Sequence, residues 1–429
     1  MKKALVLLVL ALLAVGVLGA HAQASPVELR ITWYDDGNEG TVLRDLLDRF
    51  QAENSDITVV LDTVPYTNIQ EQLPLQVEAG EGPDMARVTD FARYRGFYLD
   101  LRPLVADAAY WDESFPVAVF QAMRNADDPA DALYGFPNQF TVTGPFINRT
   151  LFDQAGVAVP SDSSDAVTWE EWTAAASAVQ EALGEGTYAI AMDRSGHRFA
   201  GPAFSEGAVL FAEDGSVTID TPGFRTMAQI LLDWHANGLT PMDVWVGSGG
   251  SYAAAAPYFI NGQLAVYMSG SWQISNFATN IGDAFDWEAV PNPTGPGGST
   301  GMPGGTVLVA FSETQHPAEV ARVMDYLASV DVYKEFVERT LFIPGHQNLG
   351  ELSYQTDLPA AQQSLNMFAA EALHLSDQAY ELQYGGRAFA INNPIRDRLT
   401  QAITGELTLD DAIARIQDDV NTALANAGS

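Results

Sequence analysis

The chain of 429 residues contains no cysteine. It can therefore form no disulfide, no thiolate metal site and no thiol nucleophile. Without cross-links the fold depends on a packed core, and a hydrophobic content of 47% supplies the residues for one. At about 150 residues per domain, this length predicts two or three structural units.

Basic residues are the second shortage. Lysine and arginine number 21 against 55 acidic residues, for a net charge of −34, and the only lysines are Lys2, Lys3 and Lys334. A nucleic-acid-binding surface needs basic side chains to neutralise phosphates, and an anionic membrane attracts basic segments. The composition therefore argues against nucleic acid as a partner and against docking on an anionic membrane.

Motifs for metal binding, phosphate binding and catalysis are also scarce. The histidines show no His-Glu-x-x-His or other ligand spacing, and no glycine loop precedes Lys334. Residues 297–301 match Gly-x-Ser-x-Gly, but a nucleophile elbow has to lie between a strand and a helix. Here Ser299 stands in a loop rich in glycine and proline. We therefore expect no catalytic residue, no metal and no cofactor.

A hydrophobic run occupies the N-terminus. Lys2 and Lys3 precede apolar residues 4–18, and Ala22-Gln23-Ala24 follows. Spanning a bilayer takes about 20 apolar residues, more than this run has, so it predicts a secretory signal peptide cleaved after Ala24. With no cysteine to carry a lipid anchor, we expect a soluble periplasmic or extracellular protein. Cleavage would remove two lysines and no acidic residue, so the net charge of the exported chain would change from −34 to −36.

Beyond the signal, alternating patterns predict short strands separated by helices. Residues 27–33 alternate as a strand does, and a helix with Thr41 as its N-cap follows. A second helix is expected over residues 68–79, kinked at Pro74, and Thr168 with Glu171 forms a capping box for a third. Strand–helix–strand repeats of this length indicate an α/β fold with a parallel sheet.

Two tryptophans lie beside loops at strand ends. Trp33 ends the first strand, and Trp272 follows residues 264–270, another predicted strand. Ligands of α/β sheets bind beyond the carboxyl ends of strands. An indole face suits the apolar face of a pyranose, with carboxylates and amides holding the hydroxyl groups. The alternative for Trp272 is a packing role at the end of its strand.

Residues 259–272 follow the pattern Phe-x-x-Gly-x-x-Ala-Met…Gly-x-Trp, with Val266 in place of the methionine. Together with residues 80–84, 134–137, 146–156, 168–172 and 304–305, this segment is similar to the family 1 extracellular solute-binding proteins. These are the maltose-binding-protein-like receptors of ABC importers, and the resemblance runs over essentially the whole exported chain.

The resemblance implies a two-lobed periplasmic-binding-protein fold of type II, in which each lobe is a sheet flanked by helices. The ligand would lie in the cleft between the lobes, which close about a hinge. Residues 25–138 and 306–343 would form the N-terminal lobe, and residues 139–305 and 344–429 the C-terminal lobe, after a signal peptide at 1–24.

The implied function is capture of a mono- or short oligosaccharide and its delivery to the permease subunits of an ABC importer, by a monomeric receptor. Stacking by Trp272, hydroxyl contacts from Asp90 and the first loop, and backbone contacts at the cleft would hold the sugar. The implied ligand-binding residues, Trp33 included for its place at a strand end, are Trp33, Asp36, Asn38, Glu39, Asp90, Asn138, Gln139, Trp272, Gly304, Gly305 and Arg387. Two alternatives stay open: a receptor of the same fold for a polyamine or another cationic solute, and a secreted hydrolase.

Overall fold

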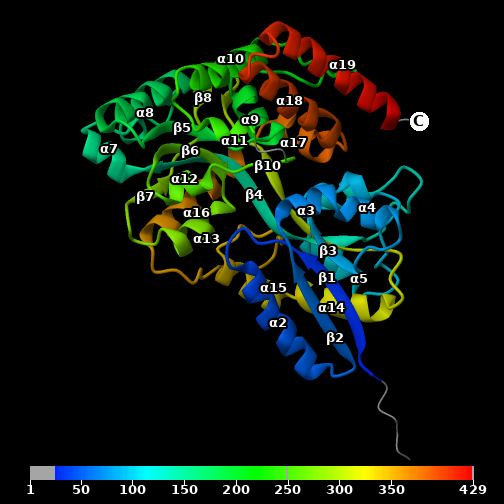
Figure 1. Ribbon diagram of the computed structural model, residues 1–429. Coiled ribbons are helices and arrows are strands. Elements are labelled where there is room, and N and C mark those ends of the chain that lie inside the picture. Colours follow the sequence, from blue (N-terminus) through cyan, green and yellow to red (C-terminus); the bar gives the residue numbers. More distant parts are fainter. Residues whose placement is uncertain (1–24, 248–249, 428–429) are drawn as a thin grey trace, which may run out of the picture.

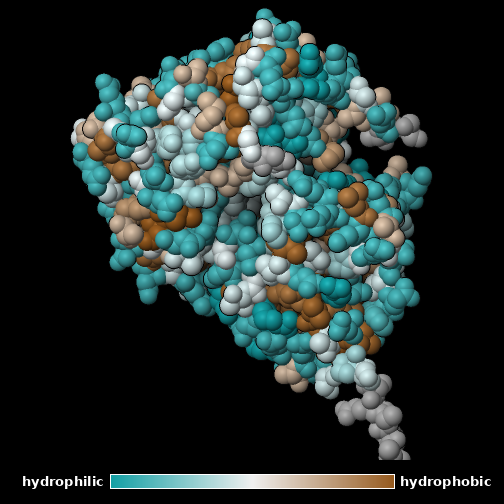
Figure 2. Space-filling view, in the orientation of Figure 1, coloured by the Kyte–Doolittle hydropathy of each residue, from teal (hydrophilic) through white to brown (hydrophobic). Residues whose placement is uncertain are grey.

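Two lobes joined by long strands make up the molecule (Figure 1), a computed structural model that describes residues 25–247 and 250–427. The predicted signal peptide lies outside the described residues. Each lobe has its own hydrophobic core. Figure 2 shows a mostly hydrophilic outer surface that is hollowed where the lobes meet.

The N-lobe is built on three parallel strands with helices on both sides. Helices α2, α14 and α15 pack together beside β1 and β2. Its elements are β1 (Val27–Trp33), α2 (Glu39–Glu53), β2 (Ile57–Thr63), α3 (Tyr66–Glu71), α4 (Leu73–Glu78), β3 (Met85–Val88), η1 (Ala92–Tyr94), α5 (Ala108–Ser114), α6 (Val117–Met123), α14 (Pro317–Ala328) and α15 (Val330–Thr340).

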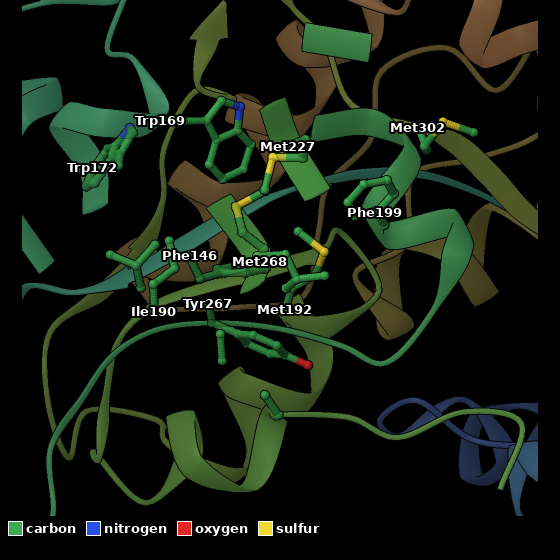
Figure 3. Packing of buried hydrophobic residues seen from close by; sticks show 14 of the residues in the cluster. Phe146, Trp169, Trp172, Ile190, Met192, Phe199, Met227, Tyr267, Met268 and Met302 are labelled. Carbon is green, nitrogen blue, oxygen red and sulfur yellow. The ribbon is translucent and has the colours of Figure 1, made fainter. Parts of the chain in front are cut away.

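The C-lobe holds the larger core. Figure 3 shows part of it, where Phe146, Tyr267 and Met268 pack below Trp169. Its elements are α7 (Arg149–Ala155), η2 (Pro160–Asp162), α8 (Trp169–Leu183), β5 (Tyr188–Met192), α9 (Gly196–Ser205), α10 (Pro222–Ala236), α11 (Met242–Trp245), α12 (Ala256–Ile260), β6 (Leu264–Gly270), α13 (Gln273–Asn280), β7 (Trp287–Ala289), β8 (Thr294–Gly295), β9 (Gly298–Ser299), α16 (Pro359–Glu371), η3 (Ala372–His374), α17 (Asp377–Tyr384), α18 (Ala388–Ile403) and α19 (Leu409–Ala427).

Strands β4 (Gly135–Asn148) and β10 (Pro303–Ala310) run between the lobes and join both halves into one sheet, in the order β2-β1-β3-β10-β4-β6-β5. The two strands are antiparallel, with Gly305 opposite Phe140. A third segment passes the same point, because the Phe140 N–H donates to the carbonyl oxygen of Ile343 at 2.9 Å. Next to it, Leu341 packs into the C-lobe core and Phe342 into the N-lobe core. The residue-level lobe boundaries stay a prediction.

Two predicted helices have different ends in the structure. Helix α2 begins at Glu39 with Asn38 as its N-cap, not Thr41, because the Glu39 side chain turns back to accept hydrogen bonds from the N–H groups of Asp36 and Gly37. The helix expected over 68–79 is two helices, α3 and α4, that meet at Gln72. Pro74 lies in the first turn of α4, where its missing N–H costs no helical hydrogen bond.

Other local predictions agree with the structure. The capping box of α8 is present, with the Thr168 side chain accepting from the N–H of Glu171 and the Glu171 side chain accepting from the N–H of Thr168. Over the described part of the chain, no helix combines the length and the hydropathy needed to cross a bilayer.

Candidate ligand-binding site

A cavity of about 320 Å³ lies between the lobes. Its walls are the segments that follow the carboxyl ends of β1, β2 and β3 in the N-lobe and of β5 and β6 in the C-lobe. Residues of the hinge strands β4 and β10 also line it. In α/β sheets this edge is where ligands bind, and the volume is within the range of small-molecule sites.

The N-lobe wall is organised by Arg87, which is fully buried. Its guanidinium donates to Asp36 at 2.9 Å, to Glu39 at 2.8 Å and to Gln139 at 2.8 Å, and it lies 4.1 Å from the centroid of the Tyr34 ring. Four contacts on one planar group fix the side chains around it. Arg87 therefore positions Asp36 and Gln139, which both line the cavity.

Three aspartates of the N-lobe line the cavity: Asp35, Asp36 and Asp90. Burial raises the pKa of the Asp36 carboxyl to about 6, although Arg87 acts in the opposite direction. Burial likewise raises the pKa of Asp90, which follows β3, against the opposing charge of Arg93. Both are acceptors in a partly dehydrated site, where a hydrogen bond from a ligand counts for more than it does in water.

The C-lobe wall includes the first turn of α9. Arg198 donates to Nδ1 of His197 at 2.8 Å, and Nε2 of His197 lies 3.0 Å from the carbonyl oxygen of Pro303. Burial lowers the pKa of His197 to about 3, so the ring is neutral and carries its proton on Nε2. Behind Arg198, the buried Asp193 accepts hydrogen bonds from the hydroxyls of Tyr252 at 2.7 Å and Tyr267 at 2.6 Å.

The two lobes touch at the rim of the cavity. The N–H and the hydroxyl of Ser251 donate to Glu71 at 3.0 Å and to Gln70 at 2.9 Å. The Tyr66 and Tyr252 rings meet edge to face with centroids 5.5 Å apart. The lobes are therefore in direct contact across the mouth of the cavity.

The structure brings six of the predicted site residues together. Asp36, Asp90, Gln139, Trp272, Gly304 and Gly305 all line the cavity, although they come from five separate segments of the sequence. Whether each one contacts a ligand stays a prediction.

Trp33 and Glu39 are placed in the interior instead. Trp33 is 1% exposed and packs edge to face on Phe336, because strand alternation puts it on the same buried face as Leu29 and Ile31. Glu39 is fully buried in its ion pair with Arg87. The expectation of an exposed indole face at position 33 is wrong.

Asn38, Asn138 and Arg387 do not line the cavity and bond to other residues. Asn38 links the lobes, since its Oδ1 accepts from Ser275 at 3.0 Å, and Asn138 accepts from Thr306 at 2.9 Å inside the hinge. Arg387 forms an ion pair with Glu381 and donates to the carbonyl oxygen of Gly215 at 2.8 Å, which directs its guanidinium away from the cavity.

Several lining residues were missed by the sequence reasoning, above all Tyr66, Arg198 and Tyr252. Tyr66 and Arg198 stand a few residues after the ends of β2 and β5. Ligands of α/β sheets bind beyond the carboxyl ends of strands, and this rule applies to β2 and β5 as it does to the strands that end at residues 33 and 270. The sequence therefore contained a signal for both Tyr66 and Arg198. Tyr252 precedes a helix in a long connection and carries no such signal.

Ser299, the candidate nucleophile, lies in the two-residue strand β9, and its hydroxyl donates to the carbonyl oxygen of Asn292 at 2.8 Å. A strand-to-helix elbow is therefore absent from this part of the described chain. Within the described ranges, no group of three or more histidine, aspartate or glutamate side chains could hold a metal ion.

Residues 34–334, more than half of the chain, match the family described as Bacterial extracellular solute-binding protein. An ABC substrate-binding protein of Listeria monocytogenes in complex with cycloalternan is 18% identical, with a TM-score of 0.74 over 93% of this chain and 99% of that one. The acarbose-binding receptor GacH of Streptomyces glaucescens is 20% identical, with a TM-score of 0.72 and the same coverage. A Thermotoga lettingae solute-binding protein bound to α-D-tagatose is 17% identical, with a TM-score of 0.74 over 92% of this chain and 99% of that one.

These likenesses confirm the predicted α/β periplasmic-binding-protein fold. The matched family consists of non-catalytic receptors, so the hydrolase alternative is wrong for this chain. The chain belongs to the bacterial extracellular solute-binding proteins.

Proposed function

We propose that the protein captures a neutral carbohydrate, a monosaccharide or a short oligosaccharide, and delivers it to the permease subunits of an ABC importer. The observation that carries the proposal is the charge balance of the cavity. Each of the two arginines that line it has a carboxylate beside it: Arg198 lies 3.9 Å from Asp193, and Arg396 lies 2.7 Å from Asp397. Arginines whose charge is compensated in this way attract an anionic ligand only weakly. The hydroxyl groups of a sugar can donate to the carboxylates of the cavity and accept from its arginines.

The polar groups of the cavity match a polyhydroxy ligand. Asp36, Asp90 and Gln139 offer acceptors for sugar hydroxyls, and the backbone at Gly304 and Gly305 lets a ligand approach closely. Tyr66 and Tyr252, both half-buried and on opposite lobes, add aromatic surface for the apolar face of a sugar ring. The structural relatives named above bind cycloalternan, acarbose and tagatose, which adds support to the same class of ligand.

A cationic ligand such as a polyamine is the second candidate. The carboxylates of Asp36 and Asp90 and the net charge of −34 favour it. Basic neighbours of both carboxylates oppose it, because Asp36 is paired with Arg87 at 2.9 Å and the charge of Arg93 acts on Asp90, which weakens their attraction for a polyamine.

A thermal-shift screen separates the two candidates. The panel is glucose, galactose, xylose, maltose, trehalose, sucrose, mannitol, putrescine and spermidine. A ligand at 100 times its Kd stabilises the folded state by about 2.7 kcal/mol, so at least one sugar should raise the Tm while the polyamines leave it unchanged. Stabilisation by polyamines alone would overturn the proposal in favour of the second candidate.

We also propose export as a monomer with cleavage after Ala24. The motif Ala22-Gln23-Ala24 at the end of the hydrophobic run supports this position. N-terminal sequencing of the secreted protein should therefore begin at Ser25. A mature chain that still began at Met1 would contradict it.

A further inference from the structure

Trp272 gives the cavity little of its surface. The side chain follows β6 and is 6% exposed, and its six-membered ring lies against the backbone of Gly270, where an added Cβ would come within 2.0 Å of the ring. The exposed fraction includes whatever area faces the cavity, because water can enter there. A stacking platform for a sugar ring needs a face that is open to the ligand.

The ring instead carries a guanidinium. The Cζ atom of Arg198 lies 4.0 Å from the Trp272 centroid, within cation–π distance. Arg198 is also held by Nδ1 of His197 at 2.8 Å, and its Nε lies 3.9 Å from Oδ2 of Asp193. Three neighbours therefore fix the plane of a side chain that itself lines the cavity.

One polar atom of this arrangement is unsatisfied. Nε of Arg198 is buried and has no hydrogen-bond partner among the described residues. This atom faces the buried Asp193 and is closed to a ligand, so a ligand in the cavity can reach only the 17% of the Arg198 side chain that stays exposed.

We propose that Arg198 is a ligand-contacting residue of the cavity and that Trp272 is the positioning residue that holds its guanidinium toward the ligand. The inference rests on the proposed carbohydrate function. Trp272 then contributes to affinity through Arg198 rather than by stacking on the sugar.

The arrangement also indicates which ligand atoms Arg198 recognises. In-plane N–H groups donate to oxygens that lie side by side, such as two neighbouring hydroxyls or a hydroxyl and a ring oxygen. The negative charge of Asp193 behind the guanidinium offsets its positive charge, which favours neutral acceptors over a carboxylate or a phosphate.

A double-mutant cycle tests the inference, with affinities measured by calorimetry for the panel sugar that binds the wild-type protein most tightly. Arg198→Gln should weaken binding about 30-fold and Trp272→Leu about tenfold. If Trp272 acts through Arg198, then adding Trp272→Leu to Arg198→Gln should weaken binding less than about threefold further.

Conservative variants separate positioning from general loss of structure. Trp272→Phe keeps an aromatic face and should stay within about threefold of wild type. Arg198→Lys keeps the charge but loses the planar stack, so it should weaken binding nearly as much as Arg198→Gln. If the ligand-free Tm shows that Trp272→Leu does not fold, the sugar affinities of these two variants test the positioning role of Trp272 in its place.

Two outcomes overturn the inference alone: losses that multiply in the double variant, which would make Trp272 a direct ligand contact, and wild-type affinity in Arg198→Gln. If no sugar of the panel binds the wild-type protein, the proposed function is overturned, and this inference with it.

Discussion

At the scale of single residues, Trp33 shows how burial assigns a role. Its indole N–H donates to Asp35 at 3.1 Å while its ring packs in the N-lobe core. Trp33→Ala should therefore lower the free energy of unfolding by about 3–5 kcal/mol, because it leaves a cavity in that core. Denaturant titration measures this change.

Leu373→Ala is the matched control for Trp33→Ala, since Leu373 is 84% exposed. Its effect should stay within about 0.5 kcal/mol. A Trp33→Ala variant as stable as this control, but with weakened sugar binding, would return Trp33 to the ligand site.

Asp36 should make sugar affinity depend on pH. Its pKa is raised to about 6, and the charged groups that act on it are Arg87, Glu39 and Arg198. The ionised carboxylate accepts hydrogen bonds from hydroxyls better than the protonated acid does, so affinity should fall as the pH is lowered from about 7 to about 5. Asp36→Asn should reduce this dependence in a calorimetric titration, and any remainder should come from Asp90, whose pKa burial also raises.

The same carboxyl affects stability in the opposite direction. Its pKa in the folded protein lies above the unfolded value of about 3.9. The stabilising contribution of Asp36 is therefore fully present below about pH 4 and is lost as the pH rises through about 6. Affinity and stability that both increased with pH through this residue would contradict the assignment.

At the scale of elements, the hinge depends on a close approach between β4 and β10. Gly305 has a φ of +138°, and a Cβ at that position would lie 2.3 Å from the carbonyl oxygen of Gln139. Gly305→Ala should destabilise the protein by more than about 2 kcal/mol and weaken sugar binding, because it separates the hinge strands. Thermal unfolding and calorimetry measure the two effects.

Gly80→Ala separates backbone strain from the steric clash. Gly80 has a φ of +70° but open space around its Cβ position, so this variant should cost only about 1–2 kcal/mol and leave affinity unchanged. Equal losses of stability in both variants would mean that the clash in the hinge contributes nothing.

Local patterns in the sequence predicted many elements correctly. The alternation of residues 27–33 and the capping box at Thr168 depend on neighbours in the chain, and both are present in the structure. That same alternation also predicts a buried side chain at Trp33, which the structure shows. The N-cap of α2 was predicted wrongly because the Glu39 side chain accepts from the N–H groups of Asp36 and Gly37, and the helix already begins two residues before Thr41.

The sequence alone could not predict which side chains of the site contact one another. Arg87 joins Glu39, Asp36 and Gln139, whose positions in the chain are about 50 residues away on either side. Tertiary packing decides which carboxylate is fully buried in an ion pair and which one lines the cavity. Sequence reasoning therefore grouped Asp36 and Glu39 together, whereas the structure separates their environments.

At the scale of the whole molecule, the charge of −34 works against compactness. Salt shortens the range of repulsion from about 10 Å at 0.1 M to about 3 Å at 1 M. The Tm should therefore rise with sodium chloride over this range, which scanning calorimetry can follow. A Tm that fell with salt would show that the surface ion pairs outweigh the overall repulsion.

The central claim is that the interlobe cavity binds a neutral sugar. The most direct test is a calorimetric titration of the exported chain with the sugar that stabilises it best, at about 0.1 M and about 1 M sodium chloride. We predict one sugar bound per chain with an affinity that changes less than about twofold between the two salt concentrations, because no net charge is brought together on binding. Tight binding of spermidine that weakens strongly with salt, with no heat from any sugar, would contradict the account.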